Sequence, residues 1–415
     1  MTNAEQQKIF PVQEIGSITK PGWRVKGVSN ASRIGKREIE EAEFWGSKLS
    51  VPNYQELIGL LRSRERSKVT PSDEEKKKIK DWSVRYVLKL LENAGLDIIY
   101  SGEQWRVEMY EHAVQGIGGF ALLGSVQSFD NKYYTKGAVV STPQFVKPAY
   151  LDELAFVQKE TDKEIKVPIT GPYTIVDWSF NEFYENALRS GQKVSDIDMQ
   201  KIYFSARKEF MLDLIKNVLR KDVEILVKQG AKRIDIDEPA ITTKPNKMEM
   251  ALFARAINEL TEGFTDITFG LHNCYSDYSL LAKYLPKLRD IKQVTLEFAN
   301  HDSADLGVNP ASRPGYADLS VLNASGYKGS YGLGVVHVHD YVGHTGNGAV
   351  MNGKDIIESP ELVRDRILYA ADVVGDPYKI SVNPDCGLRT RSWEVIYSKL
   401  KAMSEGAALA REKFE

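Results

Sequence analysis

Eight short runs of β-branched and apolar residues recur along this chain, and each ends in a polar or glycine-containing cluster. Helical patterns follow nearly all of them, the clearest over residues 199–228 with Gly230 just beyond it as a stop signal. Strands that alternate with helices indicate βα units and a parallel sheet. Eight such units predict an α/β fold of the (β/α)₈ barrel class, with chemistry expected at the carboxyl ends of the strands. The runs are PVQEIGS (11–17), DIIYSGE (97–103), VPITGP (167–172), RIDIDEP (233–239), ITFGLHNC (267–274), QVTLEF (293–298), GVVHVHD (334–340) and ISVNPDCG (380–387).

Two segments exceed what a plain barrel needs. Residues 30–70 read as a helical insertion, and residues 119–166 read as an extra hairpin. A helix is predicted from Thr70, with Pro71 at its first position and acids in its first turn. Another closes the chain over residues 393–413. With neither an internal repeat nor a low-complexity linker, we expect residues 1–415 to form one elaborated domain.

Composition excludes several classes of protein. The 55 basic and 57 acidic side chains nearly cancel and form no basic stripe, so we expect no nucleic-acid partner. No apolar stretch approaches the ~18 residues that span a bilayer. Two cysteines cannot build a disulfide framework, and the polar start lacks a signal peptide, so we expect a cytoplasmic protein without a membrane partner. GIGGFA (116–121) fits a dinucleotide fingerprint but follows a helical pattern, so no nucleotide site is expected there.

Metal-binding residue types end three of the predicted strands. His272 and Cys274 end the fifth, Glu297 the sixth and Cys386 the eighth, so a barrel brings all four together. One imidazole, two thiolates and a carboxylate suit tetrahedral zinc, and donors from separate strands suit a catalytic site better than a structural one. The alternative is plainer: Cys274 as a small buried hydrophobe, His272 as a core histidine, and Glu297 paired with a basic side chain.

Several motifs resemble the C-terminal catalytic half of cobalamin-independent methionine synthase. These motifs run in the same order over nearly the whole chain: EIGSITKP, YSGEQWRVEMYEH, ITGPYTIVDWSF, DIDEPA, LHNCYSDYS, VTLEF and VNPDCGLRTRSWE. The resemblance implies a (β/α)₈ barrel whose zinc ion, one per chain, serves methyl transfer to the sulfur of homocysteine. The larger enzyme of the family carries a second, N-terminal barrel that has no counterpart here.

The resemblance also implies roles for single residues. It matches His272, Cys274, Glu297 and Cys386 to the zinc ligands, and His339 to a proton-donating histidine. Trp178 matches an aromatic residue that is associated with the folate pterin, although a core role is its alternative. The homocysteine-binding positions match Ile15, Gly16, Ser17, Glu103 and Asp237.

Physical chemistry agrees with these homocysteine positions. The carboxylates of Glu103 and Asp237 suit the ammonium group of the substrate, and the backbone N–H groups around Gly16 and Ser17 suit its carboxylate. Glu238, beside Asp237, is a candidate for shaping the pocket, and both acids have a structural role as their alternative.

The identity of the methyl donor is the open part of the sequence analysis. The segment SFDNKYYTKGAVV does not match the basic, cysteine-bearing loop that contacts folate in the family, and the N-terminal barrel is missing. We therefore expect a methylcorrinoid donor, either methylcobalamin or a corrinoid protein partner, with 5-methyltetrahydrofolate as the alternative. The loop over residues 343–355 is expected to shape the approach of that donor.

Other functions remain open at this stage. Another thiol such as coenzyme M is an alternative acceptor, although it has no ammonium group for the acidic pair. A porphyrinogen decarboxylase shares the barrel but needs no zinc, and a barrel with a purely structural zinc is the non-enzyme alternative.

Overall fold

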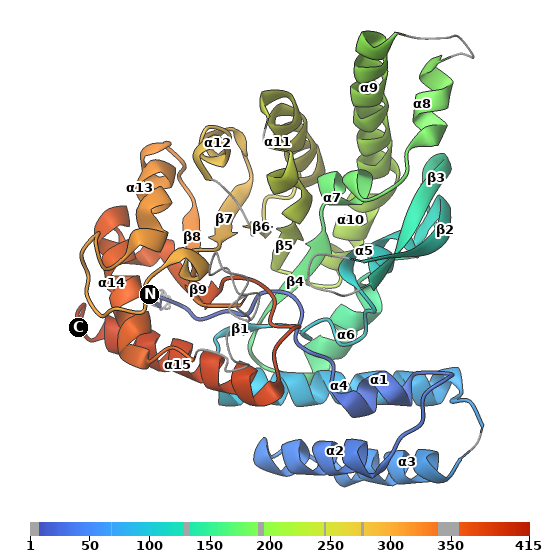
Figure 1. Ribbon diagram of the computed structural model, residues 1–415, viewed down its shortest axis with the longest axis vertical. Coiled ribbons are helices and arrows are strands. Elements are labelled where there is room, and N and C mark those ends of the chain that lie inside the picture. The colour runs from blue at the N-terminus through green and yellow to red at the C-terminus, as the bar shows by residue number, and fades with distance from the viewer. Residues whose placement is uncertain are drawn as a thin grey trace, which may run out of the picture.

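The computed structural model describes residues 8–67, 69–127, 133–189, 195–244, 246–274, 278–338 and 357–415. A seven-stranded parallel sheet lies at its centre, in the strand order β1-β4-β5-β6-β7-β8-β9 (Figure 1). Its strands are rich in buried β-branched residues, as parallel strands covered on both faces are. The strands are β1 (Ile98–Ile99), β4 (Glu164–Thr170), β5 (Arg233–Asp237), β6 (Thr268–Asn273), β7 (Ile291–Leu296), β8 (Ser330–Val336) and β9 (Ile380–Pro384).

The eighth strand position is filled by the N-terminal segment around Val12 and Gln13. Val12 forms a parallel bridge with Val382 of β9, and Gln13 forms one with Ile98 of β1. The Gln13 N–H donates to the Val382 carbonyl at 2.8 Å, and the Asp97 N–H donates to the Val12 carbonyl at 2.8 Å. This segment therefore joins the two edges of the sheet, and the predicted (β/α)₈ barrel class is confirmed.

Helices follow the strands and cover the outside of the sheet (Figure 1). The longest predicted helix is continuous from α9 through a single π-helical turn, η1, into α10, and the predicted C-terminal helix is α15. The covering helices are α4 (Asp73–Asn93), α6 (Leu151–Glu160), α9 (Asp196–Leu214), η1 (Ile215–Leu219), α10 (Arg220–Lys228), α11 (Lys247–Thr261), α12 (Tyr278–Ala282), α13 (Ala317–Ala324), α14 (Pro360–Val374) and α15 (Trp393–Arg411).

The start of α4 corrects one prediction. Pro71 is not the first helical residue, because Ser72 caps the helix and Asp73 begins it. The Ser72 hydroxyl accepts from the Glu75 N–H at 3.2 Å, and the Glu75 carboxylate accepts from the Ser72 N–H at 2.8 Å. This reciprocal pair satisfies two otherwise unpaired donors, so the capping box outweighs the preference of proline for the first turn.

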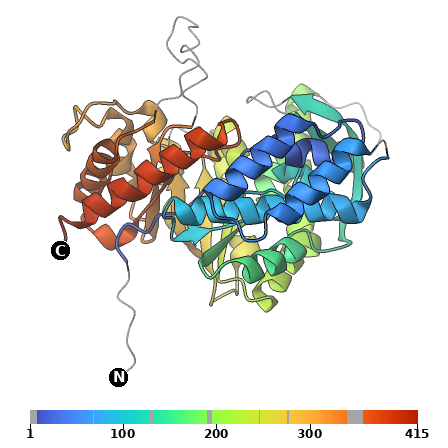
Figure 2. The same cartoon turned by 90° about the horizontal axis from the view of Figure 1, so that it is seen from below.

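The helical insertion is present and lies along the outside of α4 (Figures 1 and 2). Its indole at Trp45 packs edge-on against Trp393 of α15 with ring centroids 5.4 Å apart. The Tyr86 hydroxyl of α4 donates to the Ala42 carbonyl at 2.9 Å. The insertion therefore shares the hydrophobic core of the barrel helices. Its helices are α2 (Lys36–Lys48) and α3 (Gln55–Arg66), preceded by α1 (Gly22–Gly27).

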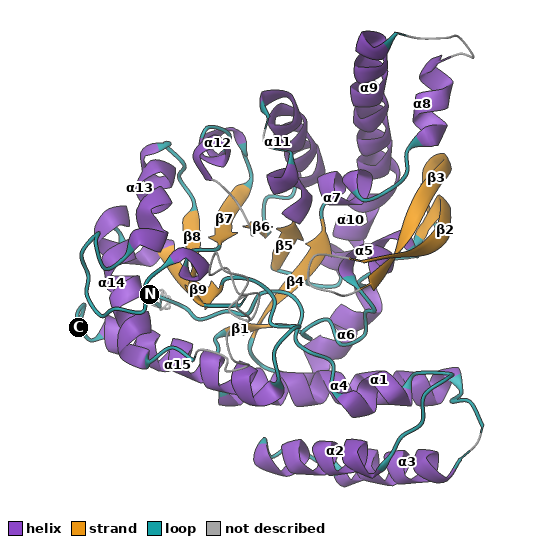
Figure 3. Cartoon of the chain, viewed as in Figure 1, coloured by secondary structure: helices purple, strands orange, loops and turns teal. Residues whose placement is uncertain are grey.

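The predicted hairpin is also present, as the antiparallel strands β2 (Ile117–Gln127) and β3 (Tyr133–Phe145) (Figure 3). Its inner strand docks on Phe180: the Val139 N–H donates to the Phe180 carbonyl at 3.0 Å, and the Phe180 N–H donates to the Gly137 carbonyl at 2.9 Å. The GIGGFA motif runs into β2 and does not form a strand–turn–helix cradle. The hairpin therefore fixes residues near Tyr134 against the end of the barrel.

Short helices complete the connections at the carboxyl ends of the strands and between the outer helices. No helix in the described ranges is both long and apolar enough to cross a membrane. The remaining elements are α5 (Met109–Val114), α7 (Pro172–Asp177), α8 (Glu182–Arg189), η2 (Pro239–Thr243), η3 (Leu285–Lys287), η4 (Ala299–His301), η5 (Pro314–Tyr316) and η7 (Pro377–Lys379).

Candidate active site

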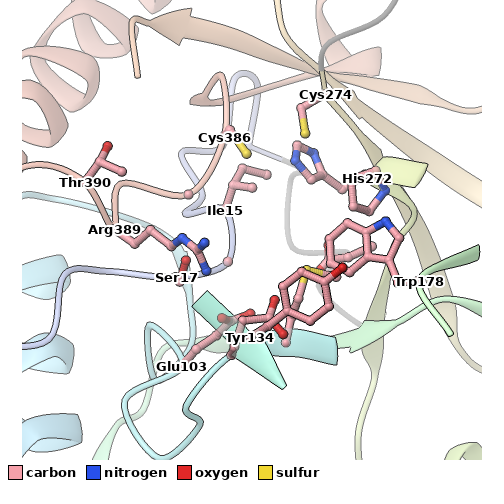
Figure 4. A pocket seen from close by; sticks show the side chains of 16 residues that line it. Ile15, Ser17, Glu103, Tyr134, Trp178, His272, Cys274, Cys386, Arg389 and Thr390 are labelled. Carbon is pink, nitrogen blue, oxygen red and sulfur yellow. The ribbon is translucent and has the colours of Figure 1, made fainter. Parts of the chain in front are cut away.

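A pocket opens at the carboxyl ends of the barrel strands, where the βα connections meet (Figure 4). It contains about 800 Å³ of space between the surrounding atoms, including its open mouth. The lining residues are Ile15, Gly16, Ser17, Glu103, Glu108, Met109, Tyr134, Trp178, Asp237, Pro239, His272, Cys274, Cys386, Gly387, Arg389 and Thr390.

The structure brings nearly all of the residues selected from the sequence to this pocket. The predicted homocysteine positions Ile15, Gly16, Ser17, Glu103 and Asp237 line it, together with Trp178, His272, Cys274 and Cys386. Glu297 is buried beside the pocket and does not line it. His339 and the loop over residues 343–355 lie outside the described residues, so the predictions for them stay predictions.

Three candidate metal ligands meet in this pocket. His272 lies near the end of β6, Cys274 lies just beyond that strand, and Cys386 follows β9 by two residues. Their ligand atoms all lie within 4.8 Å of one another. Zinc with bonds of about 2.1 to 2.3 Å at tetrahedral angles separates two ligand atoms by roughly 3.7 Å. A contraction of about 1 Å at most would therefore bring the three to bonding positions.

The hydrogen bonds of His272 leave one ring nitrogen available to a metal. Its Nδ1 lies 3.1 Å from the Thr295 hydroxyl oxygen, which itself lies 3.4 Å from the Leu271 carbonyl oxygen. Since the hydroxyl donates to that carbonyl, it accepts from Nδ1–H, which leaves Nε2 unprotonated. Nε2 is buried without a nitrogen or oxygen partner among the described residues; burial lowers the pKa of His272, and the neighbouring Cys386 sulfur more than offsets this. Such an outer hydrogen bond on the far nitrogen is the usual arrangement of a metal-binding histidine.

The two thiols carry an electrostatic conflict that a cation relieves. The hydrogen bond of the Cys274 thiol with the neighbouring Cys386 sulfur, burial, and the repulsion between two adjacent thiolates together hold the pKa of Cys274 well above its ordinary value. A divalent metal reverses this preference, since coordination deprotonates a thiol. The buried Nε2 of His272 and the paired thiols therefore fit a zinc ion.

Glu297, the fourth predicted ligand, lies outside the group of three. Its carboxylate accepts from the Asn300 side-chain amide at 2.6 Å, and its backbone N–H donates to the Tyr278 hydroxyl at 2.8 Å. The charge of Glu297 contributes to the raised pKa of Cys274, so the carboxylate is within electrostatic reach of that thiol. Its carboxylate also lies 3.8 Å from Nε2 of His301.

A pair of carboxylates forms the acidic side of the pocket. Glu103 adopts a left-handed backbone with φ of 57°, a conformation that costs a non-glycine residue energy and that often occurs at functional sites. Arg106 Nη1 lies 3.5 Å from its carboxylate, and the Glu103 N–H donates to the Ser101 hydroxyl at 3.0 Å. Burial raises the pKa of Asp237 to about 7; nearby His272 opposes this rise and Glu103 adds to it. A substrate ammonium would relieve the repulsion between the two acids.

Glu238 has the structural role that was its alternative. Its carboxylate accepts from the Tyr173 N–H at 2.9 Å, the Thr174 N–H at 2.7 Å and the Thr174 hydroxyl at 2.7 Å. A Cβ on Gly171 would lie only 2.2 Å from its carboxyl carbon, so glycine is required for this approach. Glu238 therefore holds the N-terminus of α7 in place and does not line the pocket.

Two stacked aromatic rings form another wall of the pocket. Tyr134 of the hairpin lies over Trp178 with ring centroids 5.4 Å apart and planes 29° from parallel. Tyr110 supports both, edge-on to Tyr134 at 5.5 Å and tilted against Trp178 at 6.2 Å. Trp178 is half-buried and lines the pocket, so it is more than a core residue.

Sequence reasoning missed several lining residues. Tyr134 belongs to a hairpin segment that no motif covered, and only the fold shows that it reaches Trp178. Glu108 and Arg389 stand inside the quoted motifs YSGEQWRVEMYEH and VNPDCGLRTRSWE, a few residues from selected positions. Their closeness in sequence to the selected positions was the signal that could have identified Glu108 and Arg389.

Comparisons with known proteins agree with this pocket. Residues 50–409 match the family model described as cobalamin-independent synthase, catalytic domain. A methionine synthase of Thermoplasma volcanium is 38% identical over 328 residues, covering 76% of this chain and 84% of the relative. One of Pyrococcus horikoshii is 34% identical over 367 residues, covering 88% and 92%.

Solved structures show the same fold. A B12-independent methionine synthase from Shewanella sp. W3-18-1, in complex with selenomethionine, has a TM-score of 0.67 at 20% identity and covers 98% of this chain and 99% of its own. A methyltransferase from Methanosarcina mazei has a TM-score of 0.55 at 11% identity, with coverages of 98% and 94%.

The family match corrects the expected donor. The methylcorrinoid donor, methylcobalamin and the corrinoid protein partner are not supported, because the matching family is defined as cobalamin-independent. The unmatched segment SFDNKYYTKGAVV was a reason for that expectation, and it does not outweigh a family match over residues 50–409. The chain belongs to the cobalamin-independent methionine synthase family, and it is a methyltransferase that acts on homocysteine to form methionine.

Proposed function

We propose that this enzyme uses a zinc ion, held by His272, Cys274 and Cys386, to methylate homocysteine with 5-methyltetrahydrofolate as the donor. The observation that carries the proposal is the meeting of these three ligand atoms, within 4.8 Å of one another, with an acidic pair in a single pocket. Glu297 is the proposed fourth ligand, which the substrate thiol would displace. A bound zinc ion supplies positive charge that stabilises the thiolate form of a thiol at neutral pH.

The pocket residues orient homocysteine toward the three ligands. Glu103 and Asp237 bind its ammonium group, and the turn over Gly16 and Ser17 presents backbone N–H groups to its carboxylate. Gly16 has φ of 52°, and a Cβ there would lie 3.8 Å from the Glu103 carboxylate, so the turn and the acid are close neighbours. With its amino-acid end fixed there, the substrate directs its thiol along the pocket toward the side of His272.

The aromatic wall supports a flat donor. A pterin ring is planar and stacks on indole and phenol rings, which Trp178 and Tyr134 present at the pocket surface. Since donor and acceptor then enter the same pocket, the methyl group needs no carrier between them. Methyl transfer to a fixed thiolate is an in-line displacement: the bond from sulfur to the methyl group forms as the bond from the folate nitrogen breaks, and that nitrogen takes up a proton. Its rate depends mainly on holding the two reactants in register.

The acidic pair also separates homocysteine from other thiols. Coenzyme M has no ammonium group, so it would leave the repulsion between Glu103 and Asp237 without relief from the substrate. Buried like charges without a partner are costly, and the site is therefore selective for an amino-acid acceptor.

The test measures methionine formed from homocysteine and 5-methyltetrahydrofolate by zinc-loaded protein, with coenzyme M offered in parallel. We expect turnover with homocysteine alone as acceptor, a loss of at least about 100-fold in Cys386→Ser, and reduced zinc content in the same variant. Arg255→Ala is the matched control, because Arg255 is an exposed side chain of α11. Full activity of metal-free protein would refute the zinc role, and turnover with other donors only would refute the folate.

A further inference from the structure

The pocket has a basic side that the proposed roles leave unused. Arg389 lines it opposite the stacked aromatic rings, and Figure 4 shows its guanidinium extending from the Cys386 loop toward Ser17. Free homocysteine is a zwitterion, with one carboxylate for which the predicted residues supply only backbone and hydroxyl donors. A guanidinium is the side chain whose shape best matches a carboxylate.

Close packing between two segments fixes Arg389 near the homocysteine turn. A Cβ on Gly387 would lie 3.0 Å from both the backbone nitrogen and the hydroxyl oxygen of Ser17, so the two backbones are in direct contact. The Thr19 hydroxyl donates to the Leu388 carbonyl at 3.1 Å, and the Trp393 indole N–H donates to the Thr19 carbonyl at 2.7 Å. Arg389 therefore belongs to a loop that is braced on both sides against Ser17 and Thr19.

Three cations, Arg389, Lys20 and Arg24, lie near one another at this corner, together with the acids Glu103 and Glu108. Arg389 interacts with Lys20 and Glu108, and Arg24 adds a further positive charge at Lys20. Burial is the largest cause that lowers the pKa of Lys20 to about 8; the nearby cations Arg24 and Arg389 add to the shift, and Glu103 and Glu108 oppose it. A substrate carboxylate at this corner would add a further counter-charge for these cations.

A second polar group points to the same conclusion. The Thr390 hydroxyl oxygen is buried and has no hydrogen-bond partner among the described residues, and Thr390 lines the same pocket. A buried hydroxyl without a partner is costly unless a ligand or water satisfies it. Thr390 follows Arg389 in the same loop, so its hydroxyl is a second polar group on this side of the pocket.

We propose that Arg389, assisted by the Thr390 hydroxyl, binds the α-carboxylate of homocysteine and makes the enzyme selective for a zwitterionic thiol. This inference rests on the proposed function, because it assigns the other charged group on the α-carbon of the same substrate. Glu103 and Asp237 would then bind the ammonium group, and Arg389 the carboxylate.

A folate donor also carries carboxylates, on its glutamate groups, that Arg389 could bind. Both are carboxylates, but they belong to different substrates. The position of Arg389 beside the Ser17 turn favours homocysteine. Binding measured without any donor separates the two sources.

The experiment measures binding of three thiols to zinc-loaded protein by calorimetry. Homocysteine carries both charged groups, 4-mercaptobutyrate only the carboxylate, and 3-aminopropanethiol only the ammonium. The variants are Arg389→Ala, Arg389→Lys and the control Arg255→Ala. Loss of a charged hydrogen-bonded partner should weaken homocysteine and 4-mercaptobutyrate by about 10- to 100-fold in Arg389→Ala and leave 3-aminopropanethiol unchanged. Arg389→Lys should fall between, since lysine keeps the charge and loses the fork.

The outcomes separate this inference from the function on which it rests. Equal weakening of all three thiols, or of none, would overturn the carboxylate role. A raised KM for the folate donor with unchanged homocysteine binding would overturn it as well, and would assign Arg389 to the donor. Wild-type protein that binds no homocysteine would refute the proposed function itself. The lysine variant retains the charge of the loop, so it keeps the test open if Arg389→Ala does not fold.

Discussion

Replacing Thr295 with valine should weaken metal binding without touching a metal ligand. Valine has nearly the shape of threonine but no hydroxyl, so it removes the 3.1 Å contact to Nδ1 of His272. Both side chains are buried, with exposures of 0% for Thr295 and 5% for His272, so water cannot replace the lost acceptor. An unsatisfied buried N–H costs about 1 to 3 kcal/mol. The ring can avoid that cost only by moving its proton to Nε2, which removes the lone pair that a metal needs.

An unsatisfied Nδ1–H and a proton moved to Nε2 both reduce zinc affinity. The size of the reduction follows from the cost of the unsatisfied N–H. A loss of about 1.4 to 2.8 kcal/mol corresponds to about 10- to 100-fold in zinc dissociation constant, the range typical for outer partners of metal-binding histidines. The assay is competition for zinc with a chromophoric chelator at fixed pH, with Thr295→Ser as the control that keeps the hydroxyl. Equal zinc affinity in Thr295→Val and wild type would refute the assignment of Nε2 as the ligand atom.

Three further predictions test the donor wall and the barrel around it. Tyr134→Ala should weaken folate binding about 2- to 10-fold, as expected for the loss of one aromatic contact, and leave homocysteine binding unchanged, as calorimetry with each ligand would show. Burial raises the pKa of Asp222 from 3.8 to about 7, so the native state holds an extra proton and stability falls as pH rises between those values. Asp222→Asn should therefore be more stable than wild type, and the difference in unfolding free energy should grow by about 1 kcal/mol or more for each pH unit across that window. Denaturant unfolding at several pH values measures this difference. A difference that does not change with pH would contradict the prediction. Asp302→Ala should destabilise the fold by about 3 to 5 kcal/mol, because it leaves Arg313 and Arg366, each 2.9 Å from the Asp302 carboxylate, buried without that partner. A change below 1 kcal/mol in thermal unfolding would refute that role.

Much of the fold follows from local pattern in the sequence. Each predicted strand run coincides with an observed strand, except that residues 11–17 contribute only bridges at Val12 and Gln13. This segment joins sheet edges that lie far away in the chain, and no local pattern reports how many residues will pair. The start of α4 was misplaced because two good start signals, Pro71 and Ser72, stand side by side, and reciprocal hydrogen bonds decide between them.

The site residues also divide into those that the sequence pattern predicts and those that it does not. His272, Cys274 and Cys386 could be selected because a barrel gathers the carboxyl ends of its strands at one face. Tyr134 could not, since its position over Trp178 depends on how a hairpin outside the barrel pattern docks on Phe180. The role of Glu238 was equally hidden, because an acid beside a pocket and an acid that holds a helix terminus have the same sequence context.

The identity of the methyl donor was hard to predict from the sequence for a different reason. An unmatched loop suggested a corrinoid, but an unmatched segment does not indicate which ligand the pocket binds. The stacked pair of Tyr134 and Trp178 shows that a flat-ring wall can be built from a segment unlike the one expected.

The most direct test of the central claim is a titration of metal-free protein with cobalt(II), followed by addition of homocysteine. We predict one tightly bound ion per chain, with intense thiolate-to-cobalt absorption that is lost in Cys274→Ser and Cys386→Ser, and with a clear change in the visible spectrum when homocysteine is added. A bound ion whose spectrum is indifferent to homocysteine would contradict the account, because it would mark a closed structural site beside the pocket.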